Sequence, residues 1–257
     1  MSILSFIIPL RAPDTTNDWK QVSYNCIRTI SSILQQTDRD FDVYLVCNKE
    51  PEGLQSSRKL NVITDKFSTP TTLKEMRRDQ QIKIKKALVE IRNQGEADRK
   101  FLMRVDADDF ISKRLVSFIK KNQESNGFYF YWGYLFQRSC NYVLLQPNFY
   151  LISGTSAIVR LPKQDFPKSE NDPQKTWLKL FWNHQGVVNN MKERGKPMEN
   201  LPFIGAVHQC GTGENISNIN MERKGDNLKG AIKKIIFRRK FSNKIREEFS
   251  IKEELVQ

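Results

Sequence analysis

The first part of the chain alternates between short apolar runs and longer segments in which apolar residues recur at helical spacing. The short runs have the length and nearly continuous hydrophobicity of strands buried on both faces of a parallel sheet. The predicted elements are, in order, strand Ser5–Leu10, helix Trp19–Gln36, strands Phe41–Asn48 and Leu60–Thr64, helix Leu73–Asn93 and strand Lys100–Val105. Asn17 or Asp18 is expected to cap the first helix, and Gly95 to end the second. This order predicts an α/β fold with a mostly parallel sheet flanked by helices.

The chain after Val105 is expected to form a smaller and partly antiparallel section. The segment "ISKRLVSFIKKNQ" predicts a helix, and the aromatic-rich "GFYFYWGYLFQ" and "YVLLQPNFYLI" predict two strands. A turn and strand follow in "SGTSAIVR", a helix in "TWLKLFWNHQGVVNNMKERG", and a strand with a glycine-rich loop in "FIGAVHQCGTGENIS". Beyond Asn218 the tail is basic, with an amphipathic segment around Lys229–Phe241. The sequence contains no internal repeat and no low-complexity linker.

Composition limits the class of protein. The 257 residues suit one large domain with a small appendage, and 39% hydrophobic content is enough to fill a substantial core. A disordered chain is therefore disfavoured. The net charge of +13 indicates an anionic partner, which could be a phosphorylated ligand, nucleic acid or an anionic membrane surface.

Cysteine spacing and hydropathy bear on the compartment. The four cysteines are scattered, which is typical of reduced thiols in a cytosolic protein and not of a disulfide framework or a zinc site. The N-terminal "MSILSFIIPLR" has no basic region before its apolar stretch, so it is interpreted as a first strand and not as a secretory signal. No apolar run approaches the roughly 20 residues needed to cross a bilayer. A cytoplasmic protein is expected, soluble or peripheral at the inner face of the membrane.

Three carboxylates, Asp106, Asp108 and Asp109, follow directly after the predicted strand Lys100–Val105. Carboxylates this close together repel one another and are costly to desolvate, so a positive group is expected beside them. Ligands of parallel sheets bind outside the carboxyl ends of the strands, where Asp106 and Asp108 would reach a common Mg²⁺ or Mn²⁺. Such an ion would screen a departing diphosphate. The alternative is structural, because acidic pairs also occur at turns and Asp109 is a candidate cap for a helix starting near Ile111.

Three segments, "FIIPLR", "RVDADDFIS" and "HQCGTGENIS", resemble the GT-A glycosyltransferases, in particular bacterial family 2-like members, over Ile3–Ser217. The resemblance implies a Rossmann-like GT-A sheet, a nucleotide-sugar donor such as a UDP- or GDP-sugar, and Mn²⁺ or Mg²⁺ as cofactor. It places Asp106 near the ribose and the metal, and Asp108 as a direct ligand of the metal and the diphosphate. It also places Pro9 and Arg11, at the end of the first strand, beside the donor.

Two segments depart from the commonest family 2 pattern. The second strand ends in "CNKEPEG" where an acidic turn is usual, so the base-reading aspartate is missing and Asn48 or Asp65 is expected to substitute. The helix before the carboxylates contains "RRDQQIKIKK" where many members carry Ala-Arg-Asn, and Arg78 or Lys83 is expected to reach the diphosphate. For each basic residue of that helix, the alternative is a solvated helix face.

The two histidines, His184 and His208, are candidates for chemistry. Many GT-A enzymes place a C-terminal histidine on the metal, and His208, expected just after the strand "FIGAV", matches that place; the alternative is a hydrogen bond to the backbone. The resemblance also implies an inverting enzyme, which needs a general base for the acceptor hydroxyl. The candidates are His184, next to Trp182, and Glu170 and Asp172 in the exposed-looking "PKSENDPQ", whose alternative role is ordinary solubility. The choice among them, and the stereochemical outcome, stay open.

By this resemblance, residues 1–218 form one glycosyltransferase domain, with a nucleotide-binding half at 1–112 and an acceptor half at 113–218. Residues 219–257 are expected to form a basic helical tail. Its segment "KGAIKKIIFRRKF" has six lysines and arginines and no acid, so it would either lie on an anionic membrane or dock on the domain with a solvated basic face. The aromatic "FYFYWGYLF" is expected mainly in the core, with an acceptor platform for sugar rings as the alternative.

The expected function is metal-dependent transfer of a sugar from a nucleoside-diphosphate sugar to an acceptor hydroxyl, in glycan or polysaccharide synthesis. The acceptor would be a glycan or a lipid-linked molecule. Three alternatives are a metal-dependent nucleotide phosphotransferase or hydrolase, an inactive donor-fold protein acting as a partner, and a nucleic-acid-binding protein. The last is not favoured, because the sequence contains no nucleic-acid recognition motif.

Overall fold

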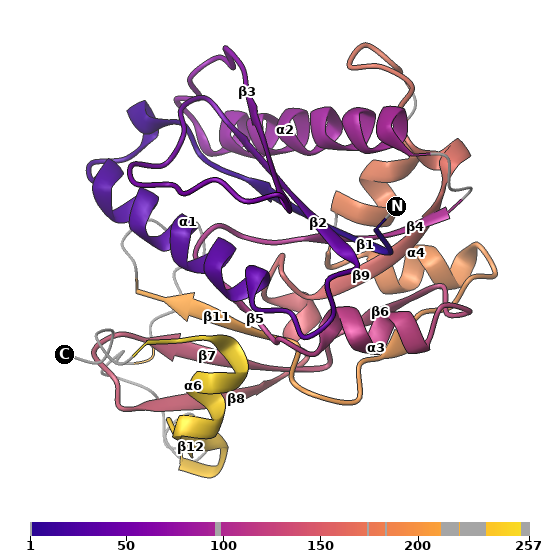
Figure 1. Ribbon diagram of the computed structural model, residues 1–257. Helices are drawn as coiled ribbons and strands as arrows, with labels where there is room; N and C mark the ends of the chain where they lie inside the picture. Colours follow the sequence, from indigo (N-terminus) through magenta and orange to yellow (C-terminus); the bar gives the residue numbers. More distant parts are fainter. Residues whose placement is uncertain are drawn as a thin grey trace.

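In the computed structural model, the chain forms two β-sheets with helices packed against them (Figure 1). The structure describes residues 2–95, 99–173, 175–182, 184–211, 221 and 235–252. None of the helices within these ranges combines the length and the hydrophobicity of a membrane span. The glycine-rich loop at 212–217 and residues 229–234 of the basic tail segment lie outside the described residues.

The larger sheet has seven strands in the order β10-β6-β9-β4-β1-β2-β3. These strands are β1 (Leu4–Pro9), β2 (Phe41–Cys47), β3 (Leu60–Thr64), β4 (Arg99–Arg104), β6 (Gly127–Tyr129), β9 (Ala157–Pro162) and β10 (Glu199–Asn200). β1 to β4 run parallel, and Leu4 of β1 pairs with Phe41 on one side and with Phe101 on the other. β9 runs antiparallel to both β4 and β6. The predicted α/β class with a mostly parallel sheet is confirmed.

Helices cover both faces of this sheet. The helices of the larger sheet are α1 (Trp19–Leu34), α2 (Leu73–Gln94), α3 (Leu115–Lys121) and α4 (Val187–Glu193); α6 (Asn243–Phe249) lies elsewhere, and η1 (Pro13–Thr15), η2 (Phe149–Leu151) and η3 (Lys163–Asp165) are short 3₁₀ turns. Phe6 and Ile8 of β1 share a core cluster with α1 and α3, whereas Ile7 shares one with α2 and α4. Figure 1 shows α1 and α2 on opposite sides of the strands. Burying an apolar side chain of this size stabilises the folded state by roughly 1.5–3 kcal/mol. Because β1 is covered on both faces, this gain is available on both, and the strand is nearly all apolar.

The ends of the two long helices agree with the sequence. Asp18 caps α1, and its carboxylate accepts a hydrogen bond from the backbone N–H of Gln21. α2 starts with a capping box in which Thr72 and Glu75 each accept from the backbone of the other. Gly95 follows the last residue of α2, as predicted.

A smaller mixed sheet has the order β12-β8-β7-β11-β5. Its strands are β5 (Phe110–Ile111), β7 (Trp132–Gln137), β8 (Tyr142–Pro147), β11 (Ala206–Cys210) and β12 (Arg238–Lys240). Helix α6 packs on this sheet through Phe249, which joins Phe110, Phe136 and Phe241 in one apolar cluster. Since β5 directly follows the three carboxylates, the carboxylates stand at the junction of the two sheets.

Tertiary contacts override three sequence predictions. The helix expected from Ile111 begins at Leu115, because Phe110 and Ile111 pair with β11. The aromatic run expected as one strand divides between β6 in the larger sheet and β7 in the smaller one. The continuous helix expected over 176–195 is interrupted between a π-type turn, η4 (Leu178–Trp182), and α4. At this break, the carbonyl of Trp182 accepts hydrogen bonds from an arginine side chain and from a nearby backbone N–H.

The described part of the basic tail is only partly helical. Residues Arg238–Lys240 form the edge strand β12, which pairs antiparallel with β8. Phe241 is buried against the ring of Phe136, so the tail is anchored to the smaller sheet. Ile235 and Ile236 remain exposed.

The strand order of the larger sheet reverses at β1, which lies between β2 and β4. In open α/β sheets, ligands bind outside the carboxyl ends of the strands at such a reversal. Two backbone bonds continue the pairing past the strand ends, from Leu10 N to Val46 O and from Val105 N to Ile7 O. The segments that follow β1 and β4 therefore border the predicted ligand crevice, and the second of them carries Asp106.

Candidate functional site

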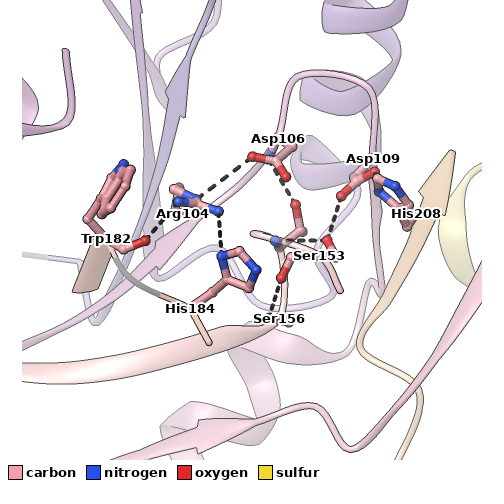
Figure 2. A network of polar contacts seen from close by, with 9 residues as sticks. Arg104, Asp106, Asp109, Ser153, Ser156, Trp182, His184 and His208 are labelled. Atoms are coloured by element: carbon pink, nitrogen blue, oxygen red, sulfur yellow. Dashed lines mark hydrogen bonds and ion pairs between the residues drawn. The ribbon is translucent and has the colours of Figure 1, made fainter. Parts of the chain in front are cut away.

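Arg104, the last residue of β4, is the centre of a polar network (Figure 2). It is 6% exposed, and its Nη1 donates to the carbonyl oxygen of Trp182 at 2.9 Å. Its Nη2 lies 3.4 Å from Nδ1 of His184, and its Nε lies 3.8 Å from Oδ1 of Asp106. The backbone N–H of Asp106 donates to Oγ1 of Thr155 at 2.8 Å. Sequence reasoning missed Arg104, because an arginine in "KFLMRV" is typical of an ordinary strand residue.

Gly154 allows Arg104 to occupy this position. A Cβ atom at residue 154 would lie 1.6 Å from Nη2 of Arg104, far closer than van der Waals contact permits. The glycine in "SGTS" is thus required by the close approach of a side chain. Thr155, in the same turn, accepts a hydrogen bond from the backbone N–H of Asp106 through its hydroxyl.

Asp109 is fully buried and accepts three hydrogen bonds. Its Oδ1 lies 2.9 Å from Nδ1 of His208 and accepts from the backbone N–H of Gln209 at 3.2 Å, while its Oδ2 accepts from Oγ of Ser153 at 3.1 Å. The prediction that Asp109 caps a helix is wrong, because α3 begins only at Leu115. Burial of a carboxylate requires such donors, and β11 and the turn before β9 supply them.

His208 lies within β11, and not after a strand as expected. Burial alone would lower its pKa, but the Asp109 carboxylate, with Asp108 and Asp106 nearby, raises the pKa of His208 to about 9. At neutral pH the ring is therefore an imidazolium, and it would have to lose a proton before it could bind a metal. Its role as a metal ligand stays a prediction.

Asp108 is half-buried on the turn between β4 and β5. Burial raises its pKa to about 8, and Asp109 and Asp106 add to this, while His208 opposes it. Burial also raises the pKa of Asp106, against the effect of Arg104. Two half-buried carboxylates under mutual repulsion are the environment in which a divalent cation would be stabilising.

The available side chains fit a metal that substrate helps to hold. Among the described residues, no group of three or more His, Cys, Asp and Glu side chains is arranged to bind a metal ion. Mg²⁺ is commonly held by one or two carboxylates, with water and substrate phosphates completing the shell. Asp106 and Asp108 would supply the two carboxylates, and a phosphorylated substrate would supply the rest.

Arg28 of α1 is a second basic residue that sequence reasoning missed. Its guanidinium carbon lies 4.6 Å from the ring centre of Phe110 and 5.4 Å from that of Tyr24. All three of its side-chain nitrogens are buried and make no hydrogen bond within the described part of the chain. Burial and the neighbouring Arg138 lower the pKa of Arg28 to about 9, whereas the charge of Asp108 opposes this. A buried cation without a hydrogen-bond partner, within electrostatic reach of Asp108, suits an anionic ligand.

Asn48 follows β2, the neighbour of β1, and Asp65 follows β3, the next strand beyond β2. The side-chain amide of Asn48 donates through Nδ2 to the carbonyl of Phe67 at 2.8 Å. Its Oδ1 is buried and has no donor among the residues that the structure describes. Asp65 is instead paired with Lys86 of α2, and its side chain is 42% exposed. Of the two predicted base-reading residues, Asn48 has the acceptor atom that a donor group of a nucleotide base or ribose would satisfy.

Lys83 has a structural role, which corrects its predicted contact with a diphosphate. Its side chain has no exposed surface, and Nζ donates to the carbonyl of Leu10 at 2.8 Å and to Oδ2 of Asp79 at 2.7 Å. The lysine thereby ties α2 to the chain that follows β1. Pro9 is buried at the end of β1, and Arg11 donates to the side chain and carbonyl of Thr15. Contact of Pro9 and Arg11 with a donor stays a prediction.

A cavity of about 710 Å³ lies between the first half of α2 and the segment 172–182. Its wall contains the basic side chains of Lys74, Arg77, Arg78, Lys85 and Lys175 and the single carboxylate of Asp172. Trp177 and Trp182 also line it, and the carbonyl of Trp182 is the group that Arg104 binds. The cavity therefore adjoins the network around Arg104. Arg78, predicted to reach a diphosphate, lies in this cavity wall.

The three candidates for the general base are divided between two places. Asp172 lines the cavity, and its Oδ2 accepts from the backbone N–H of Lys168 at 2.6 Å. Glu170 pairs with Lys86 of α2 at 2.9 Å, and its side chain is 52% exposed. His184 lies with Arg104 in the other network (Figure 2). The structure thus brings His184 near Asp106 and places the two acids on the α2 side.

His184 is neutral in this environment. Burial and the adjacent Arg104 guanidinium lower its pKa to about 4. Because Nδ1 faces Nη2 of Arg104, the lone pair of the neutral ring points at a cation. These conditions make His184 a weak base, and its predicted catalytic role has no further support here.

Comparison with known protein families finds no match, and comparison with curated proteins also finds none. Among solved structures, the chain is similar to a nucleotide-diphospho-sugar transferase from Desulfovibrio desulfuricans G20, with 13% identity, a TM-score of 0.41, and coverage of 81% of this chain and 82% of that one. It is also similar to 2-C-methyl-D-erythritol 4-phosphate cytidylyltransferase (IspD) from Francisella tularensis, with 11% identity, a TM-score of 0.42, and coverage of 85% and 95%. A third is galactosyltransferase LgtC, solved with donor and acceptor sugar analogs, with 9% identity, a TM-score of 0.41, and coverage of 81% and 87%. Because these identities and TM-scores are low, any function of this chain must be argued from the residues of its own site.

Proposed function

We propose that this protein is a metal-dependent glycosyltransferase that moves a sugar from a nucleoside-diphosphate sugar to an acceptor hydroxyl. The observation that carries the proposal is the position of Asp106 and Asp108. They directly follow β4, beside the reversal of strand order; Arg104 lies 3.8 Å from Asp106, and the charge of Asp108 acts on Arg28. A pair of carboxylates for a divalent ion and cations for phosphate oxygens are the groups that departure of a diphosphate requires.

The donor would lie across the carboxyl ends of β1, β2 and β4. Mg²⁺ or Mn²⁺, held by Asp106 and Asp108, would supply charge neutralisation for the leaving diphosphate. Nε of Arg104 forms an ion pair with Oδ1 of Asp106 at 3.8 Å, and the hydroxyl of Thr155 accepts from the backbone N–H of Asp106. Arg28 would pair with a phosphate oxygen through nitrogens that make no hydrogen bond to the residues that the structure describes. A UDP- or GDP-sugar fits this arrangement equally well.

Proton removal from the acceptor is best assigned to Asp172 among the predicted bases. Asp172 borders the cavity, whereas Glu170 is paired with Lys86 and His184 has a lowered pKa of about 4. A carboxylate on the cavity wall could accept the proton as the acceptor oxygen attacks the anomeric carbon. This assignment suits inversion at that carbon, because no covalent intermediate is needed.

A second candidate function is nucleotidyl transfer, in which a sugar phosphate attacks a nucleoside triphosphate. The same carboxylates and arginines would stabilise departing pyrophosphate, so the site geometry favours it almost equally. The two reactions differ in their products, a nucleoside diphosphate from glycosyl transfer and pyrophosphate from nucleotidyl transfer. Incubation with sugar nucleotides in one series, and with nucleoside triphosphates and sugar phosphates in another, separates them.

The direct test is thermal stabilisation of the protein by UDP, GDP and their sugars, with and without Mn²⁺. We expect one nucleotide to raise the Tm only when metal is present, and Asp108→Ala to abolish this response. Lys121→Gln, a change on the exposed surface of α3, is a control that should respond as the parent does. A metal-dependent response that is unchanged in Asp108→Ala would contradict the proposal.

A further inference from the structure

The cavity between α2 and the segment 172–182 has a strong excess of positive charge. Five basic side chains and one carboxylate, that of Asp172, contribute to its wall. The two acidic residues in the first half of α2 are engaged elsewhere. Glu75 accepts hydrogen bonds from Thr71 and Thr72 at the start of the helix, and Asp79 pairs with Lys83. Lys85 donates through Nζ to the carbonyl oxygens of Glu170 and Asp172, at 2.6 and 2.7 Å. The cations that α2 offers to a ligand in the cavity are therefore those of Lys74, Arg77 and Arg78.

The cations are arranged on one face of α2 and face a hollow. Lys74, Arg77, Arg78 and Lys85 follow helical spacing, so their side chains project from the same side of the helix. Across the cavity stand Trp177, which is 3% exposed, and Trp182. A solvated helix face would be surrounded by water, whereas this face of α2 lies across the cavity from the indole rings of Trp177 and Trp182. Like charges gathered in this way repel one another, and an anion would relieve the repulsion.

The indole N–H groups of the two tryptophans have no acceptor among the described residues. The indole Nε1 of Trp177 and that of Trp182 are both buried and make no hydrogen bond to any described residue. Buried polar groups are normally satisfied, so an oxygen-rich ligand is an appropriate partner for both. Aromatic faces beside hydrogen-bond donors are also a common setting for sugar rings.

Trp182 lies at the boundary between this cavity and the network around Arg104. Its carbonyl oxygen accepts from Arg104, and its indole extends away from Arg104 (Figure 2). Asp106 and Asp108 do not belong to the cavity wall. A diphosphate held at those carboxylates would leave the cavity cations without an anion, so they are available to a second ligand.

From these observations we infer that the cavity binds an acceptor saccharide that carries a phosphate or carboxylate group. This inference rests on the proposed function, because it assigns the acceptor of the same reaction. The cations of α2 would hold the anionic group, and the tryptophans would contact a sugar ring and its oxygen atoms. Asp172, on the same wall, would then be close to a hydroxyl of the bound saccharide.

The test uses the full chain and measures binding by calorimetry. The probes are glucose 6-phosphate, glucuronate and uncharged glucose, each titrated with and without saturating UDP and Mn²⁺. We expect the two anionic probes to bind more tightly than glucose, and to bind whether or not UDP is present. The double variant Lys74→Gln/Lys175→Gln should weaken the anionic probes by about a hundredfold, since each of the two charge-assisted hydrogen bonds contributes about tenfold. Lys20→Gln/Lys121→Gln removes the same charge from exposed helix surfaces and should change nothing.

Two results would overturn the inference. One is equal binding of the anionic probes to the parent and to the cavity variant, with both proteins folded by circular dichroism. The other is competition by UDP together with loss of UDP binding in the cavity variant, which would assign these cations to the donor nucleotide. Failure of the proposed function is recognised separately, by the response of Asp108→Ala to nucleotide and metal, because Asp108 lies outside the cavity.

Discussion

Asp109 and His208 form a buried pair that joins the acidic turn to β11. Oδ1 of the carboxylate lies 2.9 Å from Nδ1 of the ring, and both residues are at most 5% exposed. The same oxygen accepts the backbone N–H of Gln209, so the pair also fixes the strand. Asp108 is the neighbour of Asp109 in the sequence, and its position therefore depends on this pair.

The Asp109–His208 pair predicts a pH dependence of stability. The pKa of His208 in the folded protein, about 9, lies above the ordinary value of 6.5. The contribution of the pair is therefore complete below pH 6.5 and is lost as the pH rises to about 9. In urea unfolding, we expect Asp109→Asn to be destabilised relative to the parent at pH 6.5, and this difference to shrink by roughly 1–3 kcal/mol at pH 9.

The control for this experiment is Asp38→Asn, which removes a carboxylate paired with Lys120 on the surface. The pKa of Asp38 is lowered from its usual value by the hydrogen bond to Lys120, so this carboxylate does not titrate in the same range. Its effect should be the same at both pH values. If the difference between parent and Asp109→Asn were also constant, the assignment of a charged His208 would be wrong.

Gly154→Ala is expected to displace Arg104. The added Cβ would lie 1.6 Å from Nη2, so the guanidinium must leave Trp182 and Asp106. We expect a loss of roughly 1–3 kcal/mol in the free energy of unfolding, together with weaker metal-dependent nucleotide binding. The double variant Arg104→Gln/Gly154→Ala relieves the clash, and it should be more stable than the sum of the two single changes predicts. Additive losses would show that residue 154 does not act through Arg104.

Lys83→Met tests whether Lys83 is structural. Removing one partner of a buried ion pair leaves Asp79 without its cation, and the cost should be about 3 kcal/mol by urea unfolding. The double variant Lys83→Met/Asp79→Leu removes both charges and should recover a large part of that loss. Nucleotide affinity of the folded double variant should equal that of the parent. A large loss of affinity with little change in stability would restore the predicted diphosphate contact.

Arg28→Gln is expected to reduce nucleotide binding without reducing stability, whereas Lys83→Met is expected to reduce stability. The buried guanidinium makes no hydrogen bond to a described residue, so its removal should leave the Tm unchanged or slightly raised. The affinity for a nucleoside diphosphate with Mn²⁺ should fall by about tenfold, because a charge-assisted contact is lost. Arg58→Gln, a change at an exposed loop residue, is the matched control. Lower stability with unchanged affinity would make Arg28 a packing residue only.

Much of the fold could be read from the chain because its signals are local. The near-continuous hydrophobicity of β1 and β2 reflects burial on two faces, and the caps at Asp18 and Gly95 are properties of a few neighbouring residues. The position of Asp106 and Asp108 after a parallel strand was equally visible. Each of these features depends on residues that are close in sequence.

The remaining site residues had no local signal. Arg104 is a strand residue whose partners, Trp182 and His184, are about 80 positions away, and Asp109 meets His208 across 99 positions. Lys83 was expected at a ligand, but its Nζ donates a hydrogen bond to a carbonyl 73 positions earlier. Spacing along one element cannot report such partners, because they come from other elements.

The sequence by itself determined the α/β order, the apolar strands, the helix caps and the cluster of carboxylates after the fourth parallel strand, since propensity, periodicity and capping act over a few residues. Only the tertiary structure decided which carboxylate is tied to His208, which arginines face the site and which lysine is buried. Those outcomes depend on desolvation and on hydrogen-bond partners, and both are set when distant segments pack together.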